Sequence, residues 1–234
     1  MPALTRCNMV TIIERPSPNH DARPEGQVVD LIVLHYTGMR SAEEALDRLR
    51  DPAAKVSAHY LLDEDGSVSR LVPEHRRAWH AGVASWRGSS DINARSLGIE
   101  LVNPGHEFGY RPFPEAQMAA LIELCHVLRA RHGIERQGLV GHSDVAPLRK
   151  LDPGEFFDWR RLAGEGLSVW PEQRAAAVET TPLRNLRRLQ DFGYGYLAED
   201  PGAVVRAFQR RFRPSVISGE IDAETAALLG GLVA

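Results

Sequence analysis

The sequence predicts an α/β domain followed by a small domain of three helices. Two continuous apolar runs rich in β-branched residues, 28–37 and 96–104, are typical of strands that are buried on both faces. Two stretches with helical spacing of their apolar residues, 41–50 and 114–131, alternate with these strands along the chain. After Leu167 this alternation stops and three short amphipathic segments follow, which indicates a separate helical unit.

Smaller signals predict further elements of the α/β domain. The stretch AHYLLDEDGSVSRLVP alternates around Asp65–Gly66, a strong β-hairpin signal. Ser41, with Glu44 three residues later, has the pattern of a capping box at the start of a helix. Gly133 is suited to end the 114–131 helix, because glycine readily adopts the left-handed conformation found there. GLVGH predicts a short strand, and FFDWRRLAGEGL predicts one more short helix.

Composition divides the chain into four parts. Residues 1–26 are rich in Pro and Asn and lack a period, which predicts an extended arm. Residues 27–167 form the main α/β domain, and residues 168–181, with little apolar periodicity, form a linker. Residues 182–234 form the three-helix domain, which begins with Thr181 as N-cap and a proline at the first helical position.

The bulk properties exclude several classes of function. The chain has 234 residues and a net charge of −3, so no basic field attracts nucleic acid or an anionic membrane. No apolar run approaches the roughly 20 residues needed to span a bilayer. The start lacks a basic head followed by a long apolar stretch, so we expect a cytoplasmic protein. The alternative is a periplasmic protein whose export signal has been removed.

The loop GHSDVAPLRKLDPG, residues 141–154, contains the first candidate site residues. His35 at the end of a predicted strand, with His142 and Asp152 on this loop, supplies two imidazoles and one carboxylate. A catalytic zinc keeps three such protein ligands and leaves one position open. The prolines of the loop disfavour a helix there and stiffen the backbone between the two ligands. Spacing alone leaves a metal site and an ordinary surface pair equally open.

Three motifs together resemble a known family. AWHAGVASWRG (78–88), NARSLGIELVN (93–103) and the 141–154 loop look like the zinc-dependent N-acetylmuramoyl-L-alanine amidases of the amidase-2 family. Phage lysozyme-type amidases and peptidoglycan recognition proteins are related to this family. The resemblance covers residues 28–162 and implies a mixed central β-sheet flanked by helices, with zinc at one edge of the sheet.

The resemblance implies a role for five residues. The zinc ligands fall on His35, His142 and Asp152, the catalytic carboxylate on Glu100, and the catalytic lysine on Lys150. Zinc lowers the pKa of water to about 7. An apolar strand raises the pKa of Glu100 toward that of a general base, and the charge of Lys150 suits an oxyanion. The alternatives are a solvent-facing Glu100 and an ordinary solvated Lys150.

Two more resemblances concern the rest of the chain. Trp79, His80 and Trp86 match a family motif that implies part of the cleft wall, with His80 either touching substrate or packed and hydrogen-bonded. The segments LRNLRRLQDFGY, VVRAFQRRF and GEIDAETAALL are similar to the small three-helix peptidoglycan-binding domain of wall hydrolases. The alternative for this unit is a helical cap that steadies the main domain or mediates dimerisation.

These implications define the expected function. It is zinc-dependent hydrolysis of the amide between N-acetylmuramoyl, or 1,6-anhydro-N-acetylmuramoyl, residues and the L-alanine of the stem peptide, in bacterial peptidoglycan degradation or recycling. One alternative is a non-catalytic peptidoglycan recognition module. Another, a structural zinc site, fits less well because a fourth protein ligand is missing. We favour a soluble anhydro-muropeptide over polymeric peptidoglycan, while stem-peptide preference and oligomeric state stay open.

Overall fold

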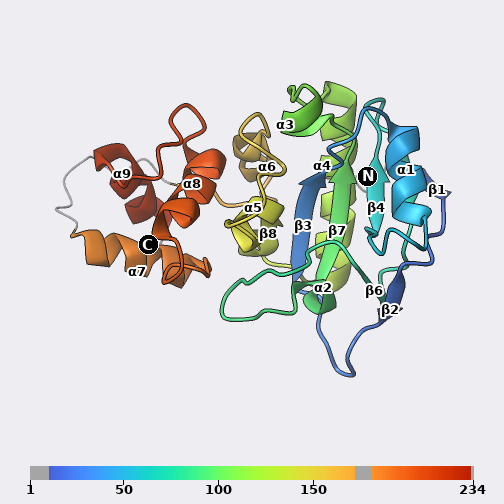
Figure 1. The fold of residues 1–234 in the computed structure, drawn as a ribbon, viewed down its shortest axis with the longest axis horizontal. Helices are drawn as coiled ribbons and strands as arrows, with labels where there is room; N and C mark the ends of the chain where they lie inside the picture. The colour runs from blue at the N-terminus through green and yellow to red at the C-terminus, as the bar shows by residue number, and fades with distance from the viewer. Residues whose placement is uncertain (1–10, 172–180, 233–234) are drawn as a thin grey trace, which may run out of the picture.

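A mixed six-stranded β-sheet forms the centre of the protein in the computed structural model, which describes residues 11–171 and 181–232 (Figure 1). The order is β1-β5-β4-β7-β3-β8; β4 and β5 are antiparallel, and the other neighbours are parallel. The strands are β1 (Ile12–Glu14), β3 (Leu31–Tyr36), β4 (Tyr60–Leu62), β5 (Val68–Arg70), β7 (Ser96–Leu101) and β8 (Leu139–Gly141). A separate antiparallel pair joins β2 (His20–Ala22) to β6 (Arg76–Ala78).

Helices cover both faces of this sheet, which confirms the predicted mixed sheet flanked by helices. They are α1 (Ala42–Arg50), α2 (Ile92–Arg95), α3 (Gly105–Phe108), α4 (Glu115–His132), the 3₁₀ turn η1 (Arg136–Gly138), α5 (His142–Val145), α6 (Trp159–Gly164), α7 (Pro182–Phe192), α8 (Pro201–Phe212) and α9 (Ala223–Leu232). Over the two described ranges, no helix is both long enough and apolar enough to cross a bilayer.

The local signals in the sequence correspond to observed elements. The hydroxyl of Ser41 accepts a hydrogen bond from the Glu44 amide at 3.2 Å and caps α1. The hairpin around Asp65–Gly66 joins β4 to β5. Gly133 ends α4 with a left-handed backbone, φ 68°. The Thr181 hydroxyl caps α7, which starts the three predicted C-terminal helices.

The predicted arm and linker lie partly outside the described residues. The structure describes the arm, residues 1–26, from residue 11 onward, and β1 and β2 lie in that part. Of the linker, residues 168–181, it describes 168–171 and 181. The division of the chain into domains at these boundaries therefore stays a prediction.

The first residues of the 141–154 loop differ from the prediction. We expected its prolines to prevent a helix, but α5 forms one helical turn before Pro147. The Asp144 carboxylate accepts a hydrogen bond from the Gly141 amide at 2.8 Å and satisfies a donor that the helix start would otherwise leave free. Proline restricts the residue before it and its own position, so a single turn ending at Val145 is compatible with Pro147.

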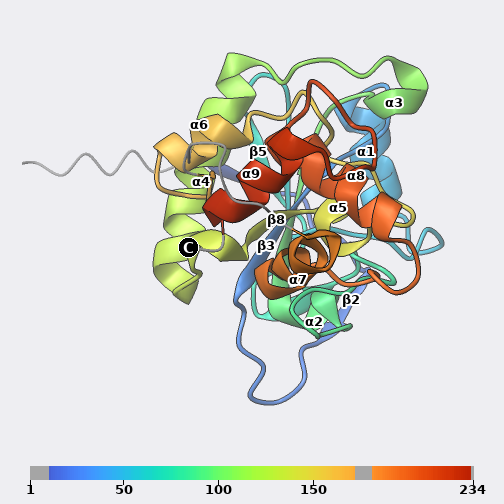
Figure 2. The same cartoon turned by 90° about the vertical axis from the view of Figure 1, so that its left-hand side faces the viewer.

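The two faces of the sheet have different partners. On one face, Leu34 and Ile99 pack with α4 in the main apolar core. On the opposite face, α1 packs over the β4 side of the sheet, while α7, α8 and α9 gather beside β3 and β8 (Figures 1 and 2). Leu31 and Val33 of β3 share their apolar cluster with Phe208 of α8. The face between these two coverings bears the candidate site.

Candidate functional site

Two adjacent parallel strands position the first candidate residues. His35 of β3 and Glu100 of β7 are partners in the strand register. Because side chains alternate along a strand, both lie on the face opposite Leu34, Ile99 and α4. They lie near the carboxyl ends of their strands and line a cavity of about 430 Å³. The strand pattern thus brings an imidazole and a carboxylate to one face of the sheet.

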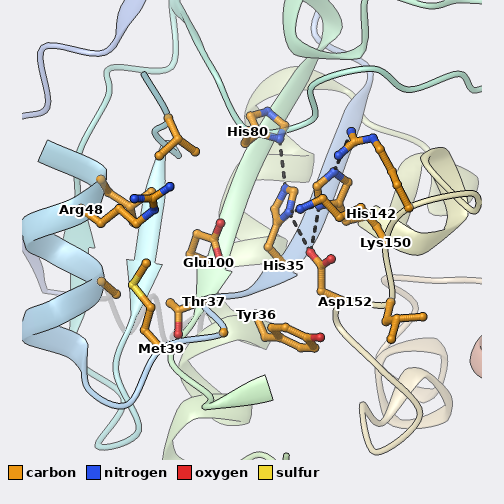
Figure 3. A pocket seen from close by; sticks show the side chains of 16 residues that line it. His35, Tyr36, Thr37, Met39, Arg48, His80, Glu100, His142, Lys150 and Asp152 are labelled. Atoms are coloured by element: carbon orange, nitrogen blue, oxygen red, sulfur yellow. Dashed lines mark hydrogen bonds and ion pairs between the residues drawn. The ribbon is translucent and has the colours of Figure 1, made fainter. Parts of the chain in front are cut away.

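The α5 turn and the loop after it add two more groups to this cavity. His35 Nδ1 lies 2.9 Å from His142 Nδ1, and the Asp152 Oδ2 atom lies 3.0 Å from both nitrogens (Figure 3). All three side chains are buried, with 2%, 3% and 6% of their residue surface exposed. The backbone amide of Ser143 donates to the Asp152 carbonyl at 2.8 Å and ties the two ends of the loop together. The predicted set of metal ligands is therefore brought together in space, as a group that could hold a metal ion.

The position of the proton on His142 follows from its second nitrogen. Nε2 lies 3.1 Å from the Ala81 carbonyl oxygen, which can only accept a hydrogen bond. The Arg149 Nη2 donor lies farther from Nε2, at 3.4 Å, so the closer carbonyl places the proton on Nε2 and Nδ1 presents a lone pair to His35 and Asp152. Arg149 holds the same segment, donating to the carbonyls of Ala81 and Val83.

A relay of hydrogen bonds assigns the proton on His35 in the same way. The Ser96 hydroxyl donates to the Ile92 carbonyl at 2.6 Å, so it accepts from His80 Nε2 at 3.1 Å. His80 Nδ1 is then an acceptor, 3.0 Å from His35 Nε2. His35 donates through Nε2 and presents the lone pair of Nδ1 to the other two candidate ligands. Burial, with His35 beside it, lowers the pKa of His80 well below its ordinary value and keeps the ring neutral.

The donor set fits zinc. Burial, with the neighbouring His142, lowers the pKa of His35 to about 4 and keeps this ring neutral as well. Two imidazole nitrogens and a carboxylate oxygen thus meet in one place, the set of donors that a catalytic zinc takes from a protein. Engagement of the second imidazole nitrogen by a protein group is also typical of metal-bound histidine.

Glu100 and Lys150 line the same cavity as the three candidate ligands (Figure 3). Burial raises the pKa of Glu100 well above its ordinary value, Asp152 adds to this, and Lys150 acts in the opposite direction. Glu100 Oε2 is buried and has no hydrogen-bond partner within the described ranges. Figure 3 shows Arg48 of α1 across the cavity from the ligands. Glu100 as a whole is half-buried, so its catalytic role and the solvent-facing alternative both stay predictions.

Sequence reasoning was incomplete around the WHAG motif. His80 lines the cavity, but Trp86 does not: it is fully buried against Phe192 and Tyr194 of the C-terminal unit, so the prediction for Trp86 is wrong. The roles of Ser96 and Arg149 were missed altogether. Ser96 lies 16 positions from His80, and Arg149 lies 66 and 68 positions from Val83 and Ala81, so no local spacing pattern connects these pairs.

Comparisons with known proteins agree on one family. A profile of the N-acetylmuramoyl-L-alanine amidase family matches residues 25–155. The N-acetylmuramoyl-L-alanine amidase AmiD of Escherichia coli K12 is 35% identical over 95% of this chain and 90% of its own length. The 1,6-anhydro-N-acetylmuramyl-L-alanine amidase AmpD of Haemophilus influenzae is 33% identical over 68% of this chain and 91% of its own length.

A solved structure extends this similarity to three dimensions. It is a complex of AmiD from E. coli with the substrate anhydro-N-acetylmuramic acid-L-Ala-D-γ-Glu-L-Lys, and it matches with a TM-score of 0.79 at 34% identity. The match covers 90% of this chain and 91% of the AmiD chain. The similarity therefore includes the C-terminal helices as well as the sheet that bears the site.

Proposed function

Because this chain belongs to the N-acetylmuramoyl-L-alanine amidase family, we propose a specific hydrolytic reaction for it. The bond that it cleaves joins an N-acetylmuramoyl, or 1,6-anhydro-N-acetylmuramoyl, residue to the L-alanine of the stem peptide. The observation that carries the proposal is the convergence of three lone-pair donors in one cavity with a carboxylate, Glu100, whose Oε2 atom is buried and has no partner in the described ranges. A non-catalytic recognition module has no need of this combination.

We assign zinc to His35, His142 and Asp152. When bound, zinc supplies Lewis-acid chemistry, activating water near neutral pH and polarising a carbonyl group. The protein's own contribution is to fix the three donors: the relay through His80 orients His35, and the Ala81 carbonyl orients His142. Both contacts keep the protons on the side of each ring that faces away from the other ligands.

We assign the general base to Glu100. Its raised pKa makes the carboxylate a stronger base than an exposed glutamate, and its unpartnered Oε2 atom is free to take a proton. Glu100 accepts a proton from the attacking water while the new C–O bond forms. It then delivers that proton to the leaving nitrogen as the C–N bond breaks, so that the products are a free lactyl carboxylate and the amine of L-alanine.

We assign to Lys150 the stabilisation of negative charge on the carbonyl oxygen. Lys150 is one of the residues that line the cavity, two positions before the candidate ligand Asp152. A fixed positive charge in a cavity sheltered from water stabilises a developing oxyanion more strongly than it would at the surface. The alternative, an ordinary solvated lysine, predicts little effect on turnover when the charge is removed.

The expected substrate is a soluble anhydro-muropeptide. The AmpD relative carries 1,6-anhydro-N-acetylmuramyl-L-alanine in its name, and AmiD was solved with an anhydro-muramyl tripeptide. The resemblance of residues 182–234 to wall-binding domains supports polymeric peptidoglycan as a further substrate. The cytoplasm, as the place of action, is likewise a proposal that cell fractionation tests.

Mass spectrometry of the products tests the proposed function. The protein, with and without chelator treatment, is incubated separately with a soluble anhydro-muropeptide and with intact sacculi. We expect chelator-sensitive release of the stem peptide from the muropeptide. Release from sacculi as well extends the substrate to the polymer, whereas release from neither contradicts the proposal and favours the recognition module.

A further inference from the structure

Asp144 is a buried carboxylate with a structural position unlike that of the site residues. It lies on α5, two residues after the candidate ligand His142, and only 1% of its surface is exposed. Its Oδ2 atom accepts a hydrogen bond from the Gly141 amide and closes the single turn of α5. A four-residue helix has no stability of its own, so contacts with other elements must set its position.

Two of these contacts come from the C-terminal unit, 50 and 67 positions further along the chain. Arg211 of α8 donates from Nη1 to Asp144 Oδ2 at 2.7 Å, and the hydroxyl of Tyr194 donates to Oδ1 at 2.7 Å. Burial, with Asp144 beside it, raises the pKa of Tyr194 well above its ordinary value and keeps it a neutral donor. Both oxygens of the carboxylate are therefore held by residues from outside the predicted amidase domain.

Arg211 is itself held through both terminal nitrogens, while its buried Nε atom has no hydrogen-bond partner among the described residues. Its side chain is 2% exposed, and Nη2 donates to the Leu139 carbonyl at 3.0 Å and to the Ser168 hydroxyl at 3.2 Å. Its guanidinium carbon lies 4.1 Å from the centre of the Trp159 ring. A planar guanidinium held in this way has a single position, so it can determine the place of its partner. Loss of one member of such a buried pair leaves an uncompensated charge.

The contacts of Arg211 and Tyr194 with Asp144 affect the positions of two candidate ligands, His142 and Asp152. His142 begins α5, and the amide of the next residue, Ser143, donates to the carbonyl of Asp152. Movement of α5 therefore displaces His142 and breaks the bond that ties it to Asp152. We propose that Arg211 and Tyr194 are positioning residues that act through Asp144, so that the C-terminal unit forms part of the support of the metal site.

The neighbouring arginine gives an independent second link. Arg210 Nε lies 3.8 Å from Glu155, which pairs with His106 at 3.1 Å. His106 Nδ1 lies 2.9 Å from the hydroxyl of Tyr36, and Tyr36 lines the cavity. Consecutive residues of α8 thus reach the site along two routes, one to the ligand-bearing turn and one to the cavity rim. A tethered accessory module has no need of polar contacts along two routes.

The inference rests on the proposed zinc site, and its test uses the full-length protein. Tyr194→Phe removes one hydroxyl, Arg211→Met removes the charge, and Arg211→Lys restores the charge without the planar fork. Arg213→Met is the matched control, because Arg213 pairs with Asp222 and Glu224 inside the C-terminal unit. Two quantities are measured: the zinc dissociation constant, by competition with a chromogenic chelator, and hydrogen exchange of the Ser143 amide in metal-free protein.

We expect Arg211→Met to weaken zinc binding by about ten- to a hundredfold, the usual effect of losing a group that orients a ligand. Tyr194→Phe should have a smaller effect in the same direction, and Arg211→Lys should recover part of the loss. Exchange of the Ser143 amide should quicken in the same order. Arg213→Met should change neither quantity, even where it lowers the stability of the helical unit.

The inference is overturned if every variant binds zinc as tightly as the parental protein and exchanges the Ser143 amide at the parental rate. If Arg211→Met does not fold, Tyr194→Phe decides alone, because loss of one hydroxyl leaves the buried charge pair in place. Failure of the parental protein to bind zinc contradicts the proposed function instead. The exchange of Ser143 still tests the positioning role in that case, since it is measured without metal.

Discussion

The two candidate histidine ligands are held in opposite ways. His35 lies within the sheet, at the end of a strand paired on both sides, and its orienting relay through His80 ends on Ser96 of the neighbouring strand β7. His142 lies at the sheet's edge on a single helical turn, and its support comes from the Ala81 segment and the C-terminal unit. One ligand is placed by strand register and the other by distant contacts. The position of His142 therefore depends on contacts between distant parts of the chain, whereas the position of His35 follows from the pairing of neighbouring strands.

Replacement of either histidine ligand should have the largest effect on zinc binding, and it should be equally large for His35 and His142 although the two are held differently. We expect His35→Ala and His142→Ala each to lose bound zinc and turnover together, because each leaves too few protein donors for a catalytic metal. Metal content by atomic emission, beside activity on the anhydro-muropeptide, is the measurement. Unchanged zinc content in His142→Ala would show that the edge histidine is not a ligand, and only the sheet-held half of the site would stand.

Glu100→Gln should lower turnover without changing zinc binding, and so separate the two functions of the residues that the sheet positions. The amide keeps the size of the carboxylate but cannot act as a base, so we expect turnover to fall by about a hundredfold or more. Zinc content and thermal stability serve as controls, and both should stay at the parental level because Glu100 is not a proposed ligand. Full turnover in this variant would remove Glu100 from the mechanism.

A substitution at Gly98 of β7, next to the His80 ring that orients His35, should have a smaller effect on zinc binding. A Cβ atom at Gly98 would lie 2.5 Å from His80 Cγ, closer than two such atoms can approach. We expect Gly98→Ala to displace His80, costing about 1–3 kcal/mol of stability and weakening zinc binding by about tenfold. Chemical unfolding of metal-free protein and chelator competition measure the two effects.

Gly164→Ala is the matched control for this substitution. A Cβ atom there meets nothing within 4 Å, and the position lies in α6. We expect parental zinc affinity and equal or slightly higher stability, since alanine favours a helix over glycine by about 1 kcal/mol. Equal behaviour of the two variants would mean that the relay does not orient His35.

The sequence predicted the strand-held half of the site more fully than the edge half. The two apolar runs correctly placed His35 and Glu100 in strands, and the period of two that brings both side chains to one face of the sheet is a local property of a strand. The motifs identified His142 and Asp152 as residues but gave no account of what orients them. Arg211 and Asp144 are 67 positions apart, and an arginine in an amphipathic helix gives no sign of a buried partner.

The same reasoning explains the two errors in local structure. Trp86 belongs to a motif that borders the site, yet its partners Phe192 and Tyr194 lie about a hundred residues later and bury it away from the cavity. The α5 turn escaped prediction because a side-chain bond from Asp144 to Gly141 stabilises it. Helical periodicity cannot reveal so short an element, since four residues complete only about one turn.

The close approach of Gly98 to His80 has a consequence for how this protein can evolve. The two positions lie on different elements, yet a side chain at one excludes the ring at the other. A larger residue at 98 therefore requires a smaller side chain at 80, which removes the relay to His35, whereas a change at 80 meets no steric limit from Gly98. Through this contact the glycine preserves a histidine that it never bonds to.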